Sequence, residues 1–232
     1  MPDDIQAEPR RAPEGPRALA KQRTAAQIIE VSLRLFLRDG FDAVTTEQIA
    51  KEAGVTQRTL FRHFARKELV LYEGDYDYVA RFERFLDEAM RVWNDPDDAI
   101  RSAFRSLTAY FDANRERISA IYAIIQASPQ LTAVERGHQA RIDRLVACAL
   151  DGREAYFART SGPSLQARTV AAVLFGTIRP MFRAWLNGEL TGELRLYAEL
   201  GWAHVEPVRQ AARLYADEIS AGFERIEAAQ TR

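Results

Sequence analysis

A run of cationic side chains marks one short segment of the chain. Residues 57–67 contain three arginines and one lysine and no acidic residue: Arg58, Arg62, Arg66 and Lys67. A guanidinium group forms bidentate hydrogen bonds with phosphate oxygens and can bridge N7 and O6 of guanine. The chemistry that this segment offers is therefore hydrogen bonding and charge pairing with a polyanion, not covalent catalysis.

The charge balance of the whole chain indicates that such a site is confined to one region. The 232 residues carry 32 lysines and arginines against 33 acidic residues, a net charge of −1. Residues 1–70 reverse this balance, with twelve basic and ten acidic residues. A protein that coats polyanions along its whole surface needs a large cationic excess. We therefore expect one polyanion-binding surface near the start of the chain.

The cationic run follows two short helical patterns separated by a bend. Thr46 can cap a helix that buries Ile49, Ala50 and Ala53, and Gly54 can adopt the positive φ of a tight turn. Thr56 can cap the next helix, which reaches Phe64. Two short helices joined at a glycine bend predict a helix-turn-helix.

The spacing within the second of these helices predicts which side chains face outward. At 100° per residue, Leu60 and Phe64 share one side, and Arg58 and Arg62 lie on the opposite side. Thr59 lies beside the arginines, with Phe61 and His63 on the two shoulders. Exposed arginines four residues apart are most often solvated charges, but here they directly follow the bend. We therefore interpret them as a recognition surface, in which Gln57 can pair with adenine or with phosphate.

Residues 24–70 resemble the DNA-binding head of the TetR family. The resemblance rests on LFLRDGFDAVTTEQIA, on AKEAGVTQRTLFRHF and on a lysine three residues later. Phe61 stands where the family often has tyrosine, so one phosphate-binding hydroxyl is missing. The resemblance implies that nine residues contact double-stranded operator DNA: Thr46, Thr56, Gln57, Arg58, Thr59, Phe61, Arg62, His63 and Lys67.

The periodicity elsewhere predicts an all-α fold with an N-terminal three-helix helix-turn-helix head and a larger C-terminal helical bundle that dimerises. Three-to-four-residue spacing recurs throughout, and no stretch shows sustained two-residue alternation. We expect a disordered arm over 1–20, the DNA-binding domain over 21–66 and a ligand-binding and dimerisation domain over 67–232. The expected helices are 21–38, 46–53, 56–64, 67–93, 97–113, 116–127, 130–158, 164–187, 193–200 and 203–229.

Two questions about these segments stay open. The basic residues near the start of the chain either contact DNA or belong to a solvated tail: Arg10, Arg11, Arg17, Lys21 and Arg23. The helix over 164–187 has a broad apolar side and a stripe of small residues, which suits a position between a core and a partner. The family resemblance implies that 164–187 and 203–229 form the interface of a homodimer.

A small-molecule site is expected inside the bundle. Its candidate lining residues are mostly aromatic and are more often plain core: Phe104, Tyr110, Phe111, Tyr122, Ile125, Phe175, Arg179 and Trp185. Arg179, beside Phe175 and Phe182, either meets a ligand carboxylate or forms a salt bridge across the dimer. No residue identifies the effector.

Other classes of protein have little support in the sequence. The three histidines are widely separated, Cys148 is alone, and no phosphate-binding loop, HExxH or GxSxG motif occurs, so we expect no enzyme, metal or cofactor. No apolar run is long enough to cross a bilayer or to form a signal peptide, so we expect a cytoplasmic protein without membrane contact. The expected function is that of a repressor released from a palindromic operator by a small molecule. The alternative is a helical adaptor or a ligand-binding protein without DNA binding.

Overall fold

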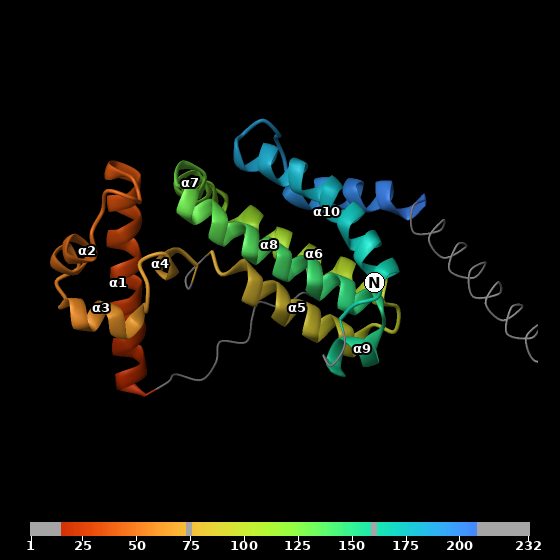
Figure 1. The fold of residues 1–232 in the computed structure, drawn as a ribbon, viewed down its shortest axis with the longest axis horizontal. Helices are drawn as coiled ribbons and strands as arrows, with labels where there is room; N and C mark the ends of the chain where they lie inside the picture. Colours follow the sequence, from red (N-terminus) through yellow and green to blue (C-terminus); the bar gives the residue numbers. More distant parts are fainter. Residues whose placement is uncertain (1–14, 73–75, 159–161, 208–232) are drawn as a thin grey trace, which may run out of the picture. The chain divides into compact units, whose positions relative to one another are not determined.

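Helices form the whole of the ordered architecture in the computed structural model, which describes residues 15–72, 76–158 and 162–207. These residues contain no β-strand, so the predicted all-α class is confirmed. The chain divides into two compact units, Met1–Gly74 and Asp75–Arg232. Figure 1 shows α1 to α4 in the first unit and α5 to α10 in the second.

The first unit is a small three-helix head followed by one short helical turn. Its elements are α1 (Pro16–Asp39), α2 (Thr46–Glu52), α3 (Gln57–His63) and α4 (Leu69–Tyr72). Ile28, Leu35 and Phe36 of α1 are buried and form the core of this unit together with Ile49 of α2 and Leu60 of α3. Burial of these side chains provides the main free energy that holds such short helices in place.

The first helix begins five residues before its predicted start at residue 21. Pro16 occupies the first turn of α1, where its fixed φ suits a helix and its missing N–H is not needed. The prediction of a disordered arm is therefore wrong for residues 16–20. Residues 1–14, including Arg10 and Arg11, lie outside the described residues.

The second unit is a bundle of longer helices. Its elements are α5 (Tyr78–Val92), α6 (Pro96–Ala113), α7 (Arg115–Ala127), α8 (Pro129–Leu150), α9 (Arg153–Ala158) and α10 (Leu165–Leu186), and residues 194–207 are also helical. The side chains of Asp95, Ser128 and Ser164 accept hydrogen bonds at the starts of α6, α8 and α10. These caps explain why the predicted helix starts at 97, 130 and 164 are close to the observed ones.

Two predicted helices are interrupted. The helix expected over 67–93 is divided into α4 and α5, and Asp77 caps the start of α5. The helix expected over 130–158 ends at Leu150, because Gly152 adopts a φ of +102° before α9 begins. Neither interruption contains a proline.

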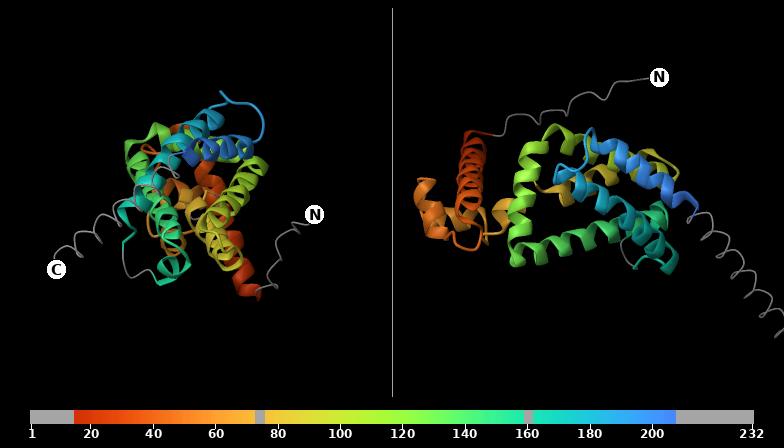
Figure 2. Two further views of the ribbon diagram at one scale, coloured as in Figure 1. Left: turned by 90° about the vertical axis from the view of Figure 1, so that its right-hand side faces the viewer. Right: turned by 90° about the horizontal axis from the view of Figure 1, so that it is seen from above.

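The predicted break near residue 200 does not occur, since residues 194–207 form one continuous helix. Figures 1 and 2 show this segment beside α10. A Cβ atom placed on Gly201 would lie 2.8 Å from Cγ1 of Ile178. Gly201 is therefore a point of close helix packing and not a helix end. The remainder of the helix predicted over 203–229 lies outside the described residues from 208 onward.

Aromatic packing forms the centre of the second unit. The ring centroids of Phe82 and Phe104 lie 4.9 Å apart, and Phe104 lies 5.9 Å from Phe175 on α10. Trp185 is fully buried and donates its indole N–H to the Gly192 carbonyl at 3.0 Å.

Among the described helices, none combines the length and the apolar composition that a membrane-spanning helix needs.

Candidate nucleic-acid interface and ligand cavity

The turn between α2 and α3 fixes the angle of the helix-turn-helix. Gly54 has a φ of +65°, and the Val55 amide donates to the Ala50 carbonyl at 2.9 Å. Ala50 and Ala53 are buried at this junction. The predicted bend at Gly54 is therefore confirmed.

The cap of α2 is Thr45 and not Thr46. The Thr45 hydroxyl accepts from the Gln48 amide, and the Gln48 side chain accepts from the Thr45 amide at 2.8 Å. This reciprocal capping box satisfies two backbone donors at once. Thr46 is the first helical residue and is half-buried, so the prediction that it caps the helix is wrong.

Helix α3 presents its cations outward as predicted. Leu60 is fully buried and Phe64 is 3% exposed, whereas Arg58 and Arg62 are exposed. Phe61 is 47% exposed, an unusual position for a phenylalanine ring. The face of α3 that carries Arg58, Phe61 and Arg62 is thus open to a partner, and we call it the cationic face.

Hydrogen bonds at the start of α3 determine what its polar groups can offer. The Thr56 hydroxyl accepts from the Thr59 amide at 3.1 Å, and the two hydroxyls lie 3.0 Å apart. The Gln57 amide nitrogen donates to Thr46 Oγ1 and to Glu47 Oε1. Both amide protons of Gln57 are directed at α2, which leaves its carbonyl oxygen as the group presented in this conformation.

Glu47, which accepts a hydrogen bond from Gln57 of α3, is a residue that the sequence reasoning did not single out. A hydrogen bond from its own backbone amide, followed by that from the Gln57 side chain, lowers the pKa of Glu47. Its carboxylate is therefore ionised at neutral pH and orients Gln57. The sequence feature that could have identified Glu47 is an acid at the second position of α2, next to the helix N-terminus.

His63 lies at the end of the cationic face and is half-buried. Burial, then the positive charges of Arg62 and Lys21, lower the pKa of the His63 ring below its ordinary value of 6.5. The effect of Lys21 indicates that the start of α1 adds positive charge near the end of α3. Arg17, Lys21 and Arg23 are all exposed on α1.

Lys67 points into the first unit. Its ammonium group donates to the carbonyl oxygens of Phe41 at 2.7 Å and Val44 at 2.9 Å, and lies 4.1 Å from the centre of the Phe41 ring. Burial lowers the pKa of Lys67. Two of its three ammonium protons form hydrogen bonds within the protein, so Lys67 stabilises the first unit.

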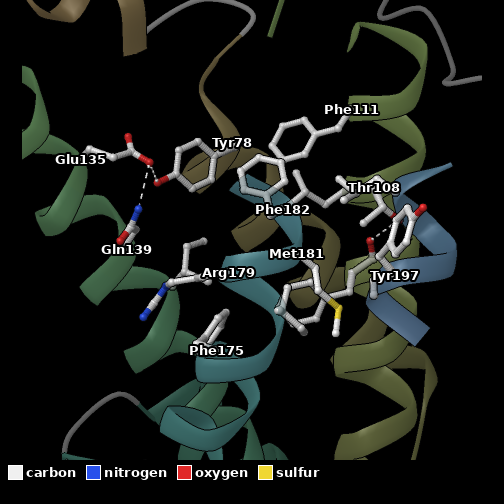
Figure 3. Close-up of a pocket in the computed structure, with 16 residues that line it drawn as sticks. Tyr78, Thr108, Phe111, Glu135, Gln139, Phe175, Arg179, Met181, Phe182 and Tyr197 are labelled. Carbon is white, nitrogen blue, oxygen red and sulfur yellow. Dashed lines mark hydrogen bonds between the residues drawn. The ribbon is translucent and has the colours of Figure 1, made fainter. Parts of the chain in front are cut away.

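The second unit contains an apolar cavity of about 90 Å³ between α5, α6, α8, α10 and the helix over 194–207 (Figure 3). The rings of Phe111 and Phe182 stack on its wall with centroids 5.1 Å apart. Residues from all five segments line it: Tyr78, Phe104, Leu107, Thr108, Phe111, Glu135, Gln139, Ile142, Phe175, Ile178, Arg179, Met181, Phe182, Leu194, Tyr197 and Ala198.

Four of the eight predicted lining residues lie on this wall: Phe104, Phe111, Phe175 and Arg179. The other four do not. Ile125 and Trp185 are fully buried in packed core, and Tyr122 is buried on α7. Tyr110 lies against the Arg81 guanidinium, 3.7 Å from the ring centre. Aromatic character alone could not separate cavity residues from core residues.

Apart from Arg179, the polar groups of the cavity were missed by the sequence reasoning. Glu135 is 4% exposed and lies on the stripe of α8 that also buries Leu131 and Ile142. An acid at a core-facing position of a helix was the signal that could have identified it. The described residues contain no cluster of side chains suited to holding a metal ion.

Comparison with known proteins places the head in one family. Residues 28–73 match the model of the bacterial regulatory proteins of the tetR family. The HTH-type transcriptional regulator TcmR of Streptomyces glaucescens is 39% identical over 102 residues, which cover 42% of this chain and 44% of that protein. The name of this relative identifies it as a helix-turn-helix transcriptional regulator.

A second relative extends into the C-terminal unit. The protein named as the mycofactocin biosynthesis transcriptional regulator MftR, from Mycobacterium tuberculosis, is 27% identical over 174 residues, covering 73% of this chain and 83% of that protein. Among solved structures, a complex of SmeT with triclosan has a TM-score of 0.57 at 20% identity, covering 79% of this chain and 91% of that one. The structural similarity supports the fold.

Proposed function

We propose that this chain, a member of the TetR family of transcriptional regulators, is a dimeric repressor that a small molecule releases from a palindromic operator. The family membership makes it a DNA-binding regulator with a helix-turn-helix. Repression, the symmetry of the operator and release by a ligand go beyond the family membership and are our proposal.

The cationic face of α3 is the observation that carries this proposal. Arg58 and Arg62 are exposed because Leu60 and Phe64 hold the opposite side of α3 in the core. This arrangement lets the guanidinium groups reach base edges in a major groove while the first turns of α2 and α3 approach phosphates. An adaptor protein without DNA binding has no physical need for such a face.

The nine proposed DNA contacts are not equivalent in the structure. We expect Arg58 and Arg62 to read bases, Thr56, Thr59 and His63 to meet phosphates, and Phe61 to make apolar contacts. Thr46 and Gln57 are held together by a hydrogen bond, so they would act as a pair. Lys67 has one proton left for a phosphate after its two bonds to Phe41 and Val44.

Dimerisation is proposed through α10 and the helix that begins at residue 194. Ala172, Gly176 and Pro180 are exposed on α10, as are Leu196 and Leu200 on the following helix, with 60% and 49% exposure for the two leucines. Small and apolar exposed residues suit close approach of a second copy. Two heads related by a two-fold axis would meet major grooves about 34 Å apart.

The cavity supports control by a ligand. A ligand that binds only the conformation unable to span the two grooves would draw the population away from DNA, with a coupling of about 1–3 kcal/mol. The SmeT structure, of similar fold, is a complex with a small aromatic compound, triclosan. A dimer lying across a promoter blocks polymerase without further parts, which favours repression over activation.

Footprinting of the full chain on the DNA upstream of its own gene tests the proposal. We expect a protected pseudo-palindrome whose half-sites are separated by about one helical turn. A scrambled sequence of the same composition serves as the control at the same salt concentration. Equal protection of both DNAs would show only salt-dependent phosphate binding and would contradict the proposal.

A further inference from the structure

The wall of the cavity is mostly apolar, and much of it consists of aromatic rings. The ring of Phe104 lies 5.9 Å from that of Phe175, and Phe111 stacks on Phe182 with an interplanar angle of 18°. An apolar guest gains free energy in proportion to the apolar area that leaves water when it binds. A charged guest loses its hydration on entering the same space and gains nothing from the rings that replaces it.

Two hydroxyl groups on the wall donate their protons to the protein itself. Thr108 donates to the carbonyl oxygens of Phe104 at 2.9 Å and Arg105 at 3.1 Å. Tyr197 donates to the Thr191 carbonyl oxygen at 2.5 Å. A hydroxyl group carries a single proton. Neither group can therefore donate to the carboxylate of a guest without breaking a bond that the protein already makes.

Glu135 belongs to a polar cluster that is also hydrogen-bonded within the protein. Tyr78 donates to Glu135 Oε1 at 2.8 Å, and Gln139 Nε2 donates to the same oxygen at 3.4 Å. Figure 3 shows these three side chains together on one side of the cavity. Glu135 is only 4% exposed. A guest that used this oxygen would have to displace a donor of the protein, so the cluster gives a cationic guest no advantage.

Arg179 is the cation on the wall, and its charge is balanced by the protein. Its guanidinium is paired with the Asp143 carboxylate on α8 and lies 4.8 Å from the centre of the Phe175 ring. Figure 3 shows the guanidinium turned away from Met181. This ion pair lies within one chain, whereas the sequence left open a ligand carboxylate or a salt bridge across the dimer. An anionic guest would have to compete with Asp143 for the guanidinium.

From these contacts we propose that the effector is a small uncharged apolar molecule, and that the ion pair between Arg179 and Asp143 keeps acids out of the cavity. The cost of removing a charged guest from water is not returned by groups that are already paired. The proposal rests on the proposed function, because it specifies the class of ligand that the same regulator binds.

The size of the cavity limits the guest. A dry cavity of about 150 Å³ is known to hold benzene, and the cavity here is about 90 Å³. A single-ring guest therefore requires the wall to widen. Met181 is half-buried on this wall, and its flexible side chain can move at low cost.

Calorimetric titration of the full chain with three matched compounds tests the proposal. The probes are toluene, benzoate and benzylamine, which share one ring. At neutral pH toluene is uncharged, benzoate is an anion and benzylamine is a cation. We expect toluene to bind at least about tenfold more tightly than either charged probe, because only toluene enters the cavity without an unpaired charge.

Asp143→Asn keeps the shape of the side chain and removes the charge that is paired with Arg179. We expect the affinity for benzoate to rise at least about tenfold, because the guanidinium then lacks its counter-charge, and the affinity for toluene to stay unchanged. Asp98→Asn, at an exposed position of α6, is the charge-matched control and should bind all three probes as the wild type does.

Ala198→Leu tests whether toluene occupies this cavity. Ala198 lines the cavity from the helix over 194–207, so the added carbons should fill the space and weaken toluene binding at least about tenfold. Ala133→Leu adds the same carbons at an exposed position of α8 and should have no effect. If Ala198→Leu does not fold, Met181→Ala provides a second test, because it enlarges the cavity and should tighten toluene binding.

Either charged probe binding as tightly as toluene would overturn the proposal, as would failure of toluene to bind the wild type. Benzoate binding that stays weak in Asp143→Asn would overturn the role of the ion pair. Unchanged toluene binding in the variants of the cavity wall would place the guest elsewhere and would also overturn the proposal. These titrations contain no DNA. A missing operator footprint would therefore refute the proposed repressor while the ranking of the probes could still stand.

Discussion

The ammonium group of Lys67 lies 2.7 Å from the carbonyl oxygen of Phe41, although 26 residues separate the two in the sequence. The same group donates to Val44 at 2.9 Å. Lys67 thus ties the loop between α1 and α2 to the segment that follows α3. The lysine that ends the family motif stabilises the head in addition to any contact with DNA.

We predict that Lys67→Met destabilises the head by about 1–2 kcal/mol, because two half-buried carbonyl groups lose their donor. Hydrogen exchange measured by mass spectrometry would report faster exchange in α1 to α3. Lys51→Met, at an exposed position of α2, is the control and should leave exchange unchanged. If Lys67 served only as a phosphate contact, its replacement would lower operator affinity without altering exchange.

Replacing either exposed arginine of α3 should weaken operator binding. We predict a loss of about 1–3 kcal/mol for Arg58→Ala or Arg62→Ala, together with relaxed base preference, at fixed salt concentration. Arg144→Ala on α8 removes the same charge from an exposed position outside the head and should have little effect. A titration that shows equal losses for all three variants would mean that only net charge matters.

The ring of His63 should make operator binding depend on pH. Its pKa in the free chain is below 6.5, so the ring is neutral at pH 7, whereas a neighbouring phosphate favours the protonated form. Binding would then take up a proton, and operator affinity should rise as pH falls from about 7.5 to about 5.5. His63→Gln should flatten this dependence, and an identical slope in both proteins would exclude His63 from the contacts.

The stability of the head should change with pH in the opposite direction. A histidine whose folded pKa lies below its unfolded value contributes fully above the unfolded pKa, near 6.5, and loses that contribution as pH falls through the folded pKa. Protection factors of the amides in the head of the free chain, which correct for the intrinsic pH dependence of exchange, should therefore fall below about pH 6.5, and less so in His63→Gln. An equal fall in both proteins would assign the effect to other groups.

The sequence predicted the head well because its signals are local. The bend at Gly54, the cap at Thr56 and the burial of Leu60 each follow from residues within one or two helical turns. The error at the start of α2, Thr46 instead of Thr45 as the cap, is a shift of one residue between two chemically equal side chains.

The cavity was predicted less well because its features depend on distant residues. Tyr78 and Glu135 are 57 residues apart, and the pairing of Arg179 with Asp143 spans 36 residues. No periodicity within one helix indicates such contacts. These pairings therefore became visible only when α5, α8 and α10 were placed together.

Gly201 shows the same limitation and leads to a final prediction. The expected interruption between the helices 193–200 and 203–229 falls at Gly201, yet this residue lies inside a continuous helix against Ile178. Alanine is favoured over glycine within a helix by about 0.5–1 kcal/mol. At Gly201 this gain is opposed by a contact of 2.8 Å between the new Cβ and Ile178 Cγ1, and forcing extra atoms into a packed site costs about 1–3 kcal/mol.

Gly137 provides the matched control, because it lies exposed within α8 and a Cβ there has no atom within 4 Å. We predict that Gly137→Ala raises the free energy of unfolding and that Gly201→Ala lies about 1–3 kcal/mol below it. Urea denaturation of both variants, followed by circular dichroism, measures the difference. Equal stabilisation by the two substitutions would mean that the helix over 194–207 does not pack closely against α10, and that Gly201 has no role in holding the two helices together.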